Sequence, residues 1–235
     1  SAIFCEKPLG IDITQSRELV ALVNNAGTPA GVNFVFSAAP SATKMSEIVG
    51  QPEFGKIIRC DLDLHFRDWP RPWHINAQWL RDRDQGGWVR EVVSHFLFII
   101  NRSLGATSVN DVLISYPDGS EGKLAETDLL ASLNSGGKPL AIKGTSGGAG
   151  PDIVNLTIRG TNSAVRIWDW YRLQVCEDGD WRDLLGTDRA KLGMNAYVEQ
   201  LDQLALMVEG ETSLIASFDE ALAVQEIVEE ILSSQ

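Results

Sequence analysis

CEKPLG, residues 5–10, lies between one predicted strand and one predicted helix, and it raises the question of why a Glu-Lys-Pro turn opens the chain. The apolar residues before it predict a short buried strand, while residues 10–27 have the apolar spacing of a helix. Asp12 is placed to cap this helix and Gly27 to end it. The run AGVNFVFSAAP, residues 30–40, predicts a second strand. A strand, a turn, a helix and another strand therefore begin the chain.

Composition narrows the classes of function. The 235 residues are 44% hydrophobic, and 32 acidic against 20 basic residues give a net charge of -12. Such a chain is expected to form a globular core and to repel nucleic acid and anionic membrane surfaces, so a small molecule or a protein is the expected partner. Cys5, Cys60 and Cys176 are scattered, which argues against a disulfide framework and a zinc site. We expect a cytoplasmic protein with no membrane span and no metal.

The middle of the chain predicts a sheet after an unusual loop. Residues 67–85 contain three tryptophans and two prolines and fit neither helical nor strand spacing, which is typical of a functional loop. A short helix in 41–51, with Ser41 near its cap, and a half-buried strand in 55–66 come before this loop. A helix from Trp88 to Ser103 follows it.

The rest of the chain completes an α+β pattern. Several strand-like runs follow one another between residues 108 and 177, with short connections that favour an antiparallel sheet. Residues 195–211 and 217–234 are helical in pattern, and Ser217 with Glu220 forms a capping box. We therefore predict a large, mainly antiparallel, open-faced sheet with helices on one face, preceded by a strand-helix unit of α/β type.

Two features could carry chemistry. Glu91 and His95 are four residues apart on a predicted helix, so a carboxylate could raise the basicity of the imidazole and fix its tautomer. The alternative is that Glu91 and His95 lie on a solvent-exposed helix face and have no chemical role. Lys7, at the carboxyl end of a strand, would point into the crevice where α/β proteins bind ligands, although Lys-Pro is also a common turn. The glycine-rich residues 144–150 lie between strand patterns and are interpreted as a hairpin loop.

The order of these features resembles one family. Glu-Lys-Pro at a strand end, Asn33 in the next strand, Trp79 with Arg81, Gln85-Gly86-Gly87, and an acid four residues before a histidine together resemble the Gfo/Idh/MocA family, named after glucose-fructose oxidoreductase, inositol dehydrogenase and a rhizopine catabolism protein. The last helical run, residues 217–234, is similar to that family's closing helix. The resemblance covers nearly the whole chain.

The resemblance implies an architecture and an activity. Family members have an NAD(P)-binding Rossmann domain, near whose end Glu-Lys-Pro lies, and a second domain that binds substrate and commonly forms the dimer contact. Residues 1–30 would be the C-terminal remnant of the Rossmann domain, with most of that domain absent, and 31–235 the substrate and dimerisation domain. A homo-oligomer is expected through a broad apolar open face of the sheet. No Gly-x-Gly-x-x-Gly occurs in the sequence.

The implied activity is that of an NAD(P)-dependent dehydrogenase acting on a CH-OH group of a sugar, a polyol or a related hydroxy compound. NAD or NADP would be the cofactor, and this chain alone, without a phosphate-binding turn, is expected to be inactive and to bind dinucleotide weakly. His95 would be the general base, with Glu91 orienting it and Lys7 assisting proton movement. The implied cofactor contacts are Glu6, Lys7, Pro8, Trp79 and Arg81, and the implied substrate contacts are Lys7, Asn33 and His95.

Several positions depart from the family pattern. Glu91 stands where aspartate is usual, Val93 where glycine is common, Phe98 where aspartate is common and Phe36 where arginine is frequent. The apolar Phe98 would remove a hydroxyl-binding partner. Two alternatives to a dehydrogenase therefore stay open. One is a non-catalytic regulatory or binding protein of the same fold, and the other is a redox-neutral, NAD-dependent lyase or glycosidase.

Overall fold

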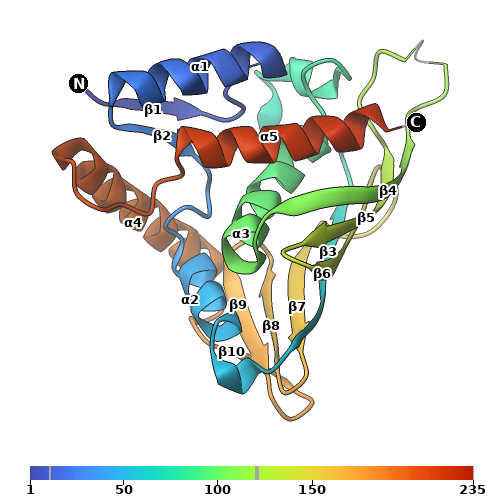
Figure 1. The fold of residues 1–235 in the computed structure, drawn as a ribbon. Helices are drawn as coiled ribbons and strands as arrows, with labels where there is room; N and C mark the ends of the chain where they lie inside the picture. Colours follow the sequence, from blue (N-terminus) through green and yellow to red (C-terminus); the bar gives the residue numbers. More distant parts are fainter. Residues whose placement is uncertain (11, 120–121, 235) are drawn as a thin grey trace.

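The computed structural model describes residues 1–10, 12–119 and 122–234, and its centre is an eight-stranded sheet (Figure 1). The strand order is β10-β9-β8-β7-β3-β6-β5-β4, and every neighbouring pair is antiparallel except β3 with β6. The strands are β3 (Ile57–Phe66), β4 (Thr107–Ser115), β5 (Asp128–Ser135), β6 (Lys138–Ser146), β7 (Ile153–Gly160), β8 (Ala164–Trp168), β9 (Arg172–Cys176) and β10 (Trp181–Asp183). The predicted mainly antiparallel sheet is confirmed.

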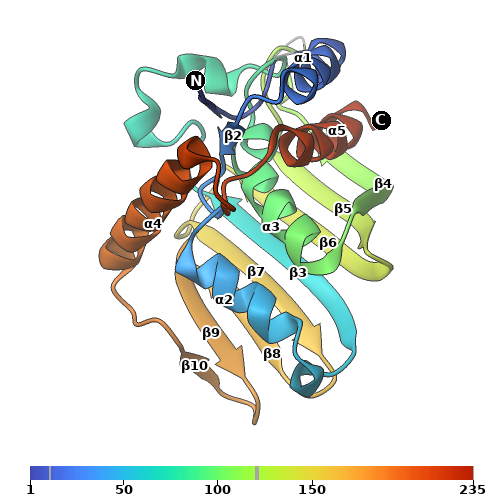
Figure 2. The same ribbon diagram turned by 60° about the vertical axis from the view of Figure 1, so that its left-hand side comes forward.

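Helices cover one face of this sheet, as Figure 2 shows for α2 and α3. Helix α2 packs over β8 and β9, α3 over β4 and β5, and α5 lies across α3 and β4. The helices are α1 (Ile13–Ala26), α2 (Pro40–Val49), α3 (Ser94–Leu104), α4 (Arg189–Glu209) and α5 (Phe218–Ser233). The core lies between the helices and the sheet and includes Leu62, Trp88 and Phe96, none of which has exposed surface. None of the described helices is long and apolar enough to cross a membrane.

The first elements form a small α/β unit of their own. Strands β1 (Ile3–Glu6) and β2 (Ala30–Asn33) pair in parallel, and α1 connects them. The side chain of Asp12 accepts a hydrogen bond from the Gln15 amide at 2.9 Å, and Gly27 ends the helix in the left-handed conformation, as the sequence predicts. The unit rests on α5, against which α1 packs. A strand-helix unit of Rossmann type therefore precedes the large sheet.

The uncovered face of the sheet is polar, whereas the expectation was a broad apolar surface. Charged side chains alternate with buried ones in β3, as Asp61 and Asp63 do, and they pair with charges on the neighbouring strands β6 and β7. Arg159 contacts Asp61 at 2.7 Å, and Lys143 contacts Asp63 at 3.1 Å. An antiparallel sheet with one solvated face is expected to alternate in this way. Exposed apolar side chains on this face concentrate at the β4–β5 end, where Leu113 pairs with Leu130.

Three local predictions differ from the structure. The strand predicted over residues 30–40 ends at Asn33, because the chain then turns, with the Ser37 amide donating to the Phe34 carbonyl at 2.9 Å. Ser41 does not cap a helix, because α2 begins at Pro40 and Ser41 is buried within its first turn. A proline is well suited to a first helical position, since its fixed φ is already helical. Residues 144–150 do not form a hairpin either. They lead from β6 to β7, and these strands lie on opposite sides of β3, so the connection crosses a strand.

Candidate functional site

Lys7 joins the N-terminal unit to the helix that carries His95. It follows β1 directly, and the Lys7–Pro8 peptide bond is cis. The ammonium donates to a side-chain oxygen of Glu91 at 2.5 Å, to the Glu91 carbonyl at 2.9 Å and to the Arg90 carbonyl at 3.3 Å. Burial lowers the pKa of Lys7, and the charge of Glu91 opposes that effect. Lys7 is therefore a buried, fully engaged cation.

The backbone that receives Lys7 is a π-turn, residues Val89–Val93, directly before α3. The Ser94 amide donates to the Val89 carbonyl, five residues back, and the Ser94 hydroxyl donates to the Arg90 carbonyl at 2.6 Å. Single π-turns inside helices are frequent at functional sites. Because the turn is wider than an α-turn, the four-residue spacing does not bring Glu91 onto His95. Among the described contacts, Glu91 engages Lys7 and none joins it to His95.

His95 is buried and has one nitrogen free. The Val35 amide donates to its Nδ1 at 3.4 Å, and the ring of Phe34 lies edge-on to it at 5.6 Å. Burial lowers the pKa of His95 well below its ordinary value, and the nearby positive charges of Lys7 and Arg71 lower it further. The imidazole is therefore neutral at neutral pH, and Nε2 has no hydrogen-bond partner among the described residues. This is the nitrogen that a ligand could reach.

The next predicted residues, Glu6 and Asn33, form part of a chain of hydrogen bonds. The Asn33 amide donates to a carboxylate oxygen of Glu6 at 2.8 Å, and Gln200 donates to the Asn33 side-chain oxygen at 2.6 Å. Gln200 belongs to α4, so these contacts tie the carboxyl ends of β1 and β2 to that helix. The polar groups of Glu6 and Asn33 are thus already paired within the protein.

Trp79 and Arg81 lie apart from this group. Both are in the short turn Gln78–Arg81 of the loop and are exposed. Arg81 folds back to donate hydrogen bonds to Gln78, one of them to its carbonyl at 3.3 Å. No described contact joins Trp79 or Arg81 to Lys7 or His95. Their implied role at the cofactor stays a prediction.

Sequence reasoning missed Arg71, which lies in the loop of residues 67–85. Its side chain is surrounded by aromatic rings, and the whole residue keeps only 9% of its surface exposed. One of these rings belongs to Trp170, at the tip of the β8–β9 hairpin, where Asp169 and Trp170 both have positive φ. A bulky residue in that conformation is rare and often marks a functional site. The sequence offered one signal: Arg71 stands between the pairs Trp69-Pro70 and Pro72-Trp73.

The apolar departures from the family pattern are core positions here. Phe98 stacks on Phe34 with ring centroids 4.7 Å apart and planes 11° apart, and the Arg102 guanidinium lies 4.3 Å from the Phe98 ring. Phe36 is equally buried and packs on Phe96. Each of these phenylalanines is therefore a packing residue, and neither offers a polar group to a substrate.

The site fits the reactive end of a nicotinamide dinucleotide in one respect. Lys7 directly follows the carboxyl end of β1, and Val35 lies two residues after that of β2. These two parallel strands are joined by a helix, and α/β sheets bind ligands at such strand ends. The ammonium of Lys7 lies close enough to His95 for its charge to lower the pKa of the imidazole. Phosphate binding would need other groups, because the sequence has no Gly-x-Gly-x-x-Gly.

Comparison with known proteins rests on structure. No family model matches the sequence, and no curated protein matches it. Many solved structures match. An NAD-binding oxidoreductase from Klebsiella pneumoniae is 17% identical, with a TM-score of 0.78 over 100% of this chain and 71% of that one. An Agrobacterium radiobacter oxidoreductase, solved with NAD+, L-tartaric acid and magnesium, is 15% identical, with a TM-score of 0.77 over 99% of this chain and 71% of that one.

A third match has a named activity. KijD10, a 3-ketoreductase from Actinomadura kijaniata solved with NADP, is 14% identical, with a TM-score of 0.73 over 98% of this chain and 70% of that one. Likeness at such identities establishes the fold, and in each case nearly all of this chain takes part in it. The predicted resemblance is thus confirmed for the fold: the chain has the architecture of the Gfo/Idh/MocA oxidoreductases.

Proposed function

We propose that this chain is the substrate-binding part of an NAD(P)-dependent oxidoreductase that acts on a CH-OH group of a sugar, a polyol or a related hydroxy compound. The observation that carries the proposal is that the Lys7–Glu91 ion pair lies beside a buried His95 whose pKa the Lys7 charge lowers and whose Nδ1 alone is bonded among the described residues. Solved structures of the same fold that contain NAD+ or NADP support a nicotinamide cofactor, NAD or NADP. The division of the chain at residues 30 and 31 is part of the proposal.

His95 would exchange the substrate proton at Nε2. When bound, the nicotinamide would supply the hydride acceptor or donor. With Nδ1 accepting from Val35, the neutral ring carries its hydrogen on Nε2, and it would donate a hydrogen bond to the oxygen of a carbonyl substrate. For alcohol oxidation the same nitrogen must be bare to act as general base, and that tautomer gives up only the long 3.4 Å contact with Val35.

Lys7 would stabilise negative charge on the same oxygen. Its ammonium already makes three hydrogen bonds to Arg90 and Glu91, which fix its position at the start of the helix. Glu91 would keep this buried amine protonated, because its negative charge raises the pKa that burial lowers. A fixed positive charge where an alkoxide develops is a large contribution to catalysis in a water-poor site.

The test is NAD(P)H formation by the complete gene product on sugars, polyols and hydroxy acids, with His95→Gln as the variant. We expect turnover to fall by about two to four orders of magnitude in His95→Gln, the usual loss for a removed acid-base group. The matched control is His65→Gln, because His65 lies on the open face of the sheet and bonds Thr145. Its turnover should match that of the wild type.

Three outcomes would contradict the proposal. Full turnover in His95→Gln would remove the proton-transfer role. Tight dinucleotide binding without turnover on a broad panel would favour the non-catalytic alternative, and substrate consumption without net nicotinamide change would favour a redox-neutral lyase or glycosidase. The 235-residue chain alone should show weak dinucleotide binding and no turnover.

We also propose that the protein is a cytoplasmic homo-oligomer that assembles through the open face of the sheet. The three cysteines are free thiols, in keeping with a reducing compartment. Leu113 and Leu130 form an exposed cross-strand pair with charged side chains beside it. An apolar contact within a polar rim is the usual anatomy of an interface.

A further inference from the structure

Arg71 sits in a cage of aromatic rings. Its guanidinium carbon is 5.0 Å from the ring centroid of Trp73, 5.3 Å from that of Trp170, 5.4 Å from that of Phe66 and 5.6 Å from that of Trp69. Cation-π attraction acts within about 6 Å, and it is stronger when the cation is desolvated. The rings come from β3, from the loop of residues 67–85 and from the β8–β9 hairpin. The stretch of residues 66–73 and the distant β8–β9 hairpin thus fix one guanidinium.

The guanidinium is not satisfied by the protein. Among the described residues Arg71 has no side-chain hydrogen bond and no ion pair, and its Nε is buried without a partner. Aromatic faces hold the cation but do not accept the hydrogen bonds of its five N–H groups. A largely buried charge whose Nε lacks an acceptor is costly, and natural sites usually pair such a charge. The missing acceptor therefore points to a ligand.

This guanidinium is close enough to the proposed catalytic group to act on it. The Trp170 ring also lies 6.1 Å from the ring of Phe96, which directly follows His95 on α3. The charge of Arg71 contributes to the lowered pKa values of His95, Lys7 and His74. Arg71 thus lies in the same neighbourhood as Lys7, His74 and His95, and a ligand that spans this neighbourhood would carry an anionic group and a hydroxyl group.

We infer that Arg71 binds the carboxylate of the substrate, so that the substrate is a hydroxycarboxylate such as a sugar acid; this inference rests on the proposed function. A carboxylate matches the planar fork of arginine with two parallel hydrogen bonds. A phosphate dianion fits less well, because Glu91 and Asp152 place negative charge near Arg71. The carboxylate would supply the acceptor that the aromatic cage lacks, while the hydroxyl carbon lies toward His95 and Lys7.

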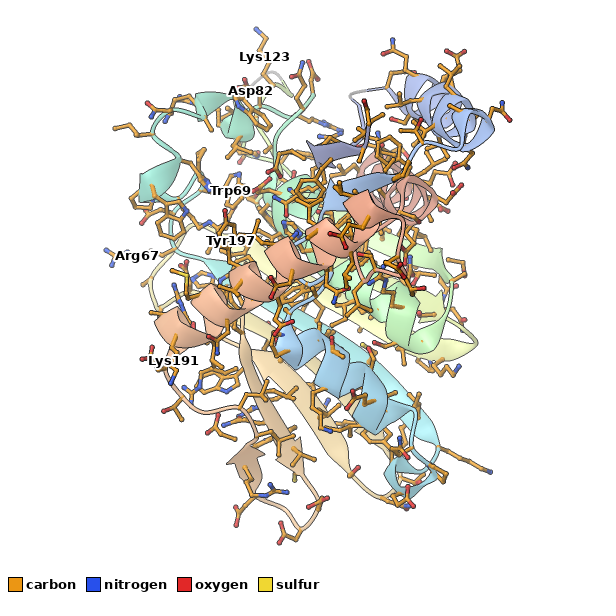
Figure 3. The ribbon with its side chains drawn as sticks, turned by 90° about the vertical axis from the view of Figure 1, so that its left-hand side faces the viewer. Arg67, Trp69, Asp82, Lys123, Lys191 and Tyr197 are labelled. Carbon is orange, nitrogen blue, oxygen red and sulfur yellow. The ribbon has the colours of Figure 1, made fainter. Side chains whose placement is uncertain are left out.

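The test measures binding to the 235-residue chain without cofactor, through the fluorescence of the cage tryptophans. The probes are D-gluconate and L-tartrate, each with its neutral counterpart, D-glucose and threitol. The variants are Arg71→Met, Arg71→Lys and the control Arg67→Met. Arg67 lies in the same loop and is exposed, and Figure 3 shows its side chain directed outward. Near-ultraviolet circular dichroism of each variant checks that the fold is kept.

We expect the wild type and Arg67→Met to bind each acid at least about tenfold more tightly than its neutral counterpart, as one charge-assisted pair provides. Arg71→Met should lose that preference, and Arg71→Lys should retain only part of it, because a lysine lacks the fork. A preference that survives in Arg71→Met would overturn the inference. So would neutral sugars binding as tightly as acids, no binding of any acid, or tighter binding of glycerol 3-phosphate.

The two proposals fail in different ways. His95-dependent turnover of neutral polyols, with no preference for acids, would overturn the role of Arg71 and leave the oxidoreductase in place. Arg71-dependent binding of acids, with no turnover by the complete gene product, would do the opposite.

Discussion

Glu126 is a buried carboxylate at the start of the helical segment that carries His95. It keeps 2% of its surface exposed, and one of its side-chain oxygens accepts a hydrogen bond from the Val89 amide at 2.7 Å. Gly87 leaves the space for it, since a Cβ on that residue would lie 2.4 Å from the other carboxylate oxygen. A carboxylate at a helix N-terminus satisfies an amide that has no partner within the helix. Glu126 therefore caps the helical segment whose Arg90 and Glu91 carbonyls accept hydrogen bonds from Lys7.

The pKa of Glu126 makes the stability of the protein depend on pH. Burial raises it from the ordinary 4.5 to about 7, and the hydrogen bond from Val89 opposes that rise only in part. Because the folded state holds this proton more tightly, the stabilisation is complete below about pH 4.5 and is lost as the pH rises through about 7. Glu126 should therefore remove about 2 to 3 kcal/mol from the free energy of unfolding between about pH 5 and pH 8.

The variant that checks this is Glu126→Gln, which keeps the acceptor for Val89 but cannot ionise. Its free energy of unfolding, measured with urea at several pH values, should lack that decline. Glu53→Gln, at an exposed carboxylate, serves as the control and should follow the wild type. Equal pH dependence in the wild type and Glu126→Gln would mean that Glu126 does not titrate in this range.

At the scale of elements, the contact between β6 and the start of the helical segment that carries His95 depends on a glycine. A Cβ on Gly144 would lie 2.5 Å from the indole of Trp88, and Trp88 is fully buried. The indole also donates a hydrogen bond to the Glu126 carbonyl at 3.0 Å, which limits how far it can move. The close approach of strand and helix thus requires a residue without a side chain at this point.

Gly144→Ala should accordingly destabilise the protein by about 1 to 3 kcal/mol, the usual cost of overpacking a well-packed core. The measurement is the urea midpoint, compared with that of Ser132→Ala on the exposed face of the neighbouring strand β5. Ser132→Ala should change the midpoint little. If Gly144→Ala were as stable as the wild type, the Trp88 indole would have to shift freely, and the proposed rigid start of the helix would be wrong.

Local chemistry explains which elements could be predicted. Asp12, Gly27 and the Ser217–Glu220 box act within one turn of their own helices, so their roles are visible in the sequence and the structure confirms them. The π-turn of residues 89–93 depends on Lys7, more than eighty residues earlier, whose ammonium takes the Arg90 and Glu91 carbonyls. No local pattern reports such a contact, and so the Glu91–His95 pairing was expected instead.

The candidate site shows the same limit. Lys7 and His95 could be singled out because a strand end and a helix spacing are sequence features. Arg71 was missed because its cage, although three of its rings lie within five residues of it in the sequence, is completed by Trp170 from a distant hairpin. The order of strands in the sheet could not be predicted either, because it too depends on contacts between distant segments. Strands β3 and β6 pair in parallel at the centre of the sheet although β4 and β5 lie between them in the sequence.

At the scale of the whole molecule, the proposed assembly depends on the open face of the sheet. Most of its charges pair within the same chain, as Lys143 does with Asp63, and so they leave little unsatisfied charge for a partner. This face also carries an exposed apolar pair. Leu113 and Leu130 lie directly opposite each other on neighbouring strands and expose 65% and 51% of their surface. Burying one such side chain is worth about 1.5 to 3 kcal/mol. A second copy related by a twofold axis would bury the pair on both chains.

The double variant Leu113→Asp/Leu130→Asp should therefore be a single chain in light scattering at micromolar concentration, whereas the wild type should have the mass of a dimer or a larger assembly. Aspartates there would have to be buried without partners in the interface, which costs more than the contact provides. Leu22→Asp is the matched control, because Leu22 is 67% exposed on α1, away from the sheet. It should assemble like the wild type. A monomeric wild type, or an assembled double variant, would show that this face is not the interface.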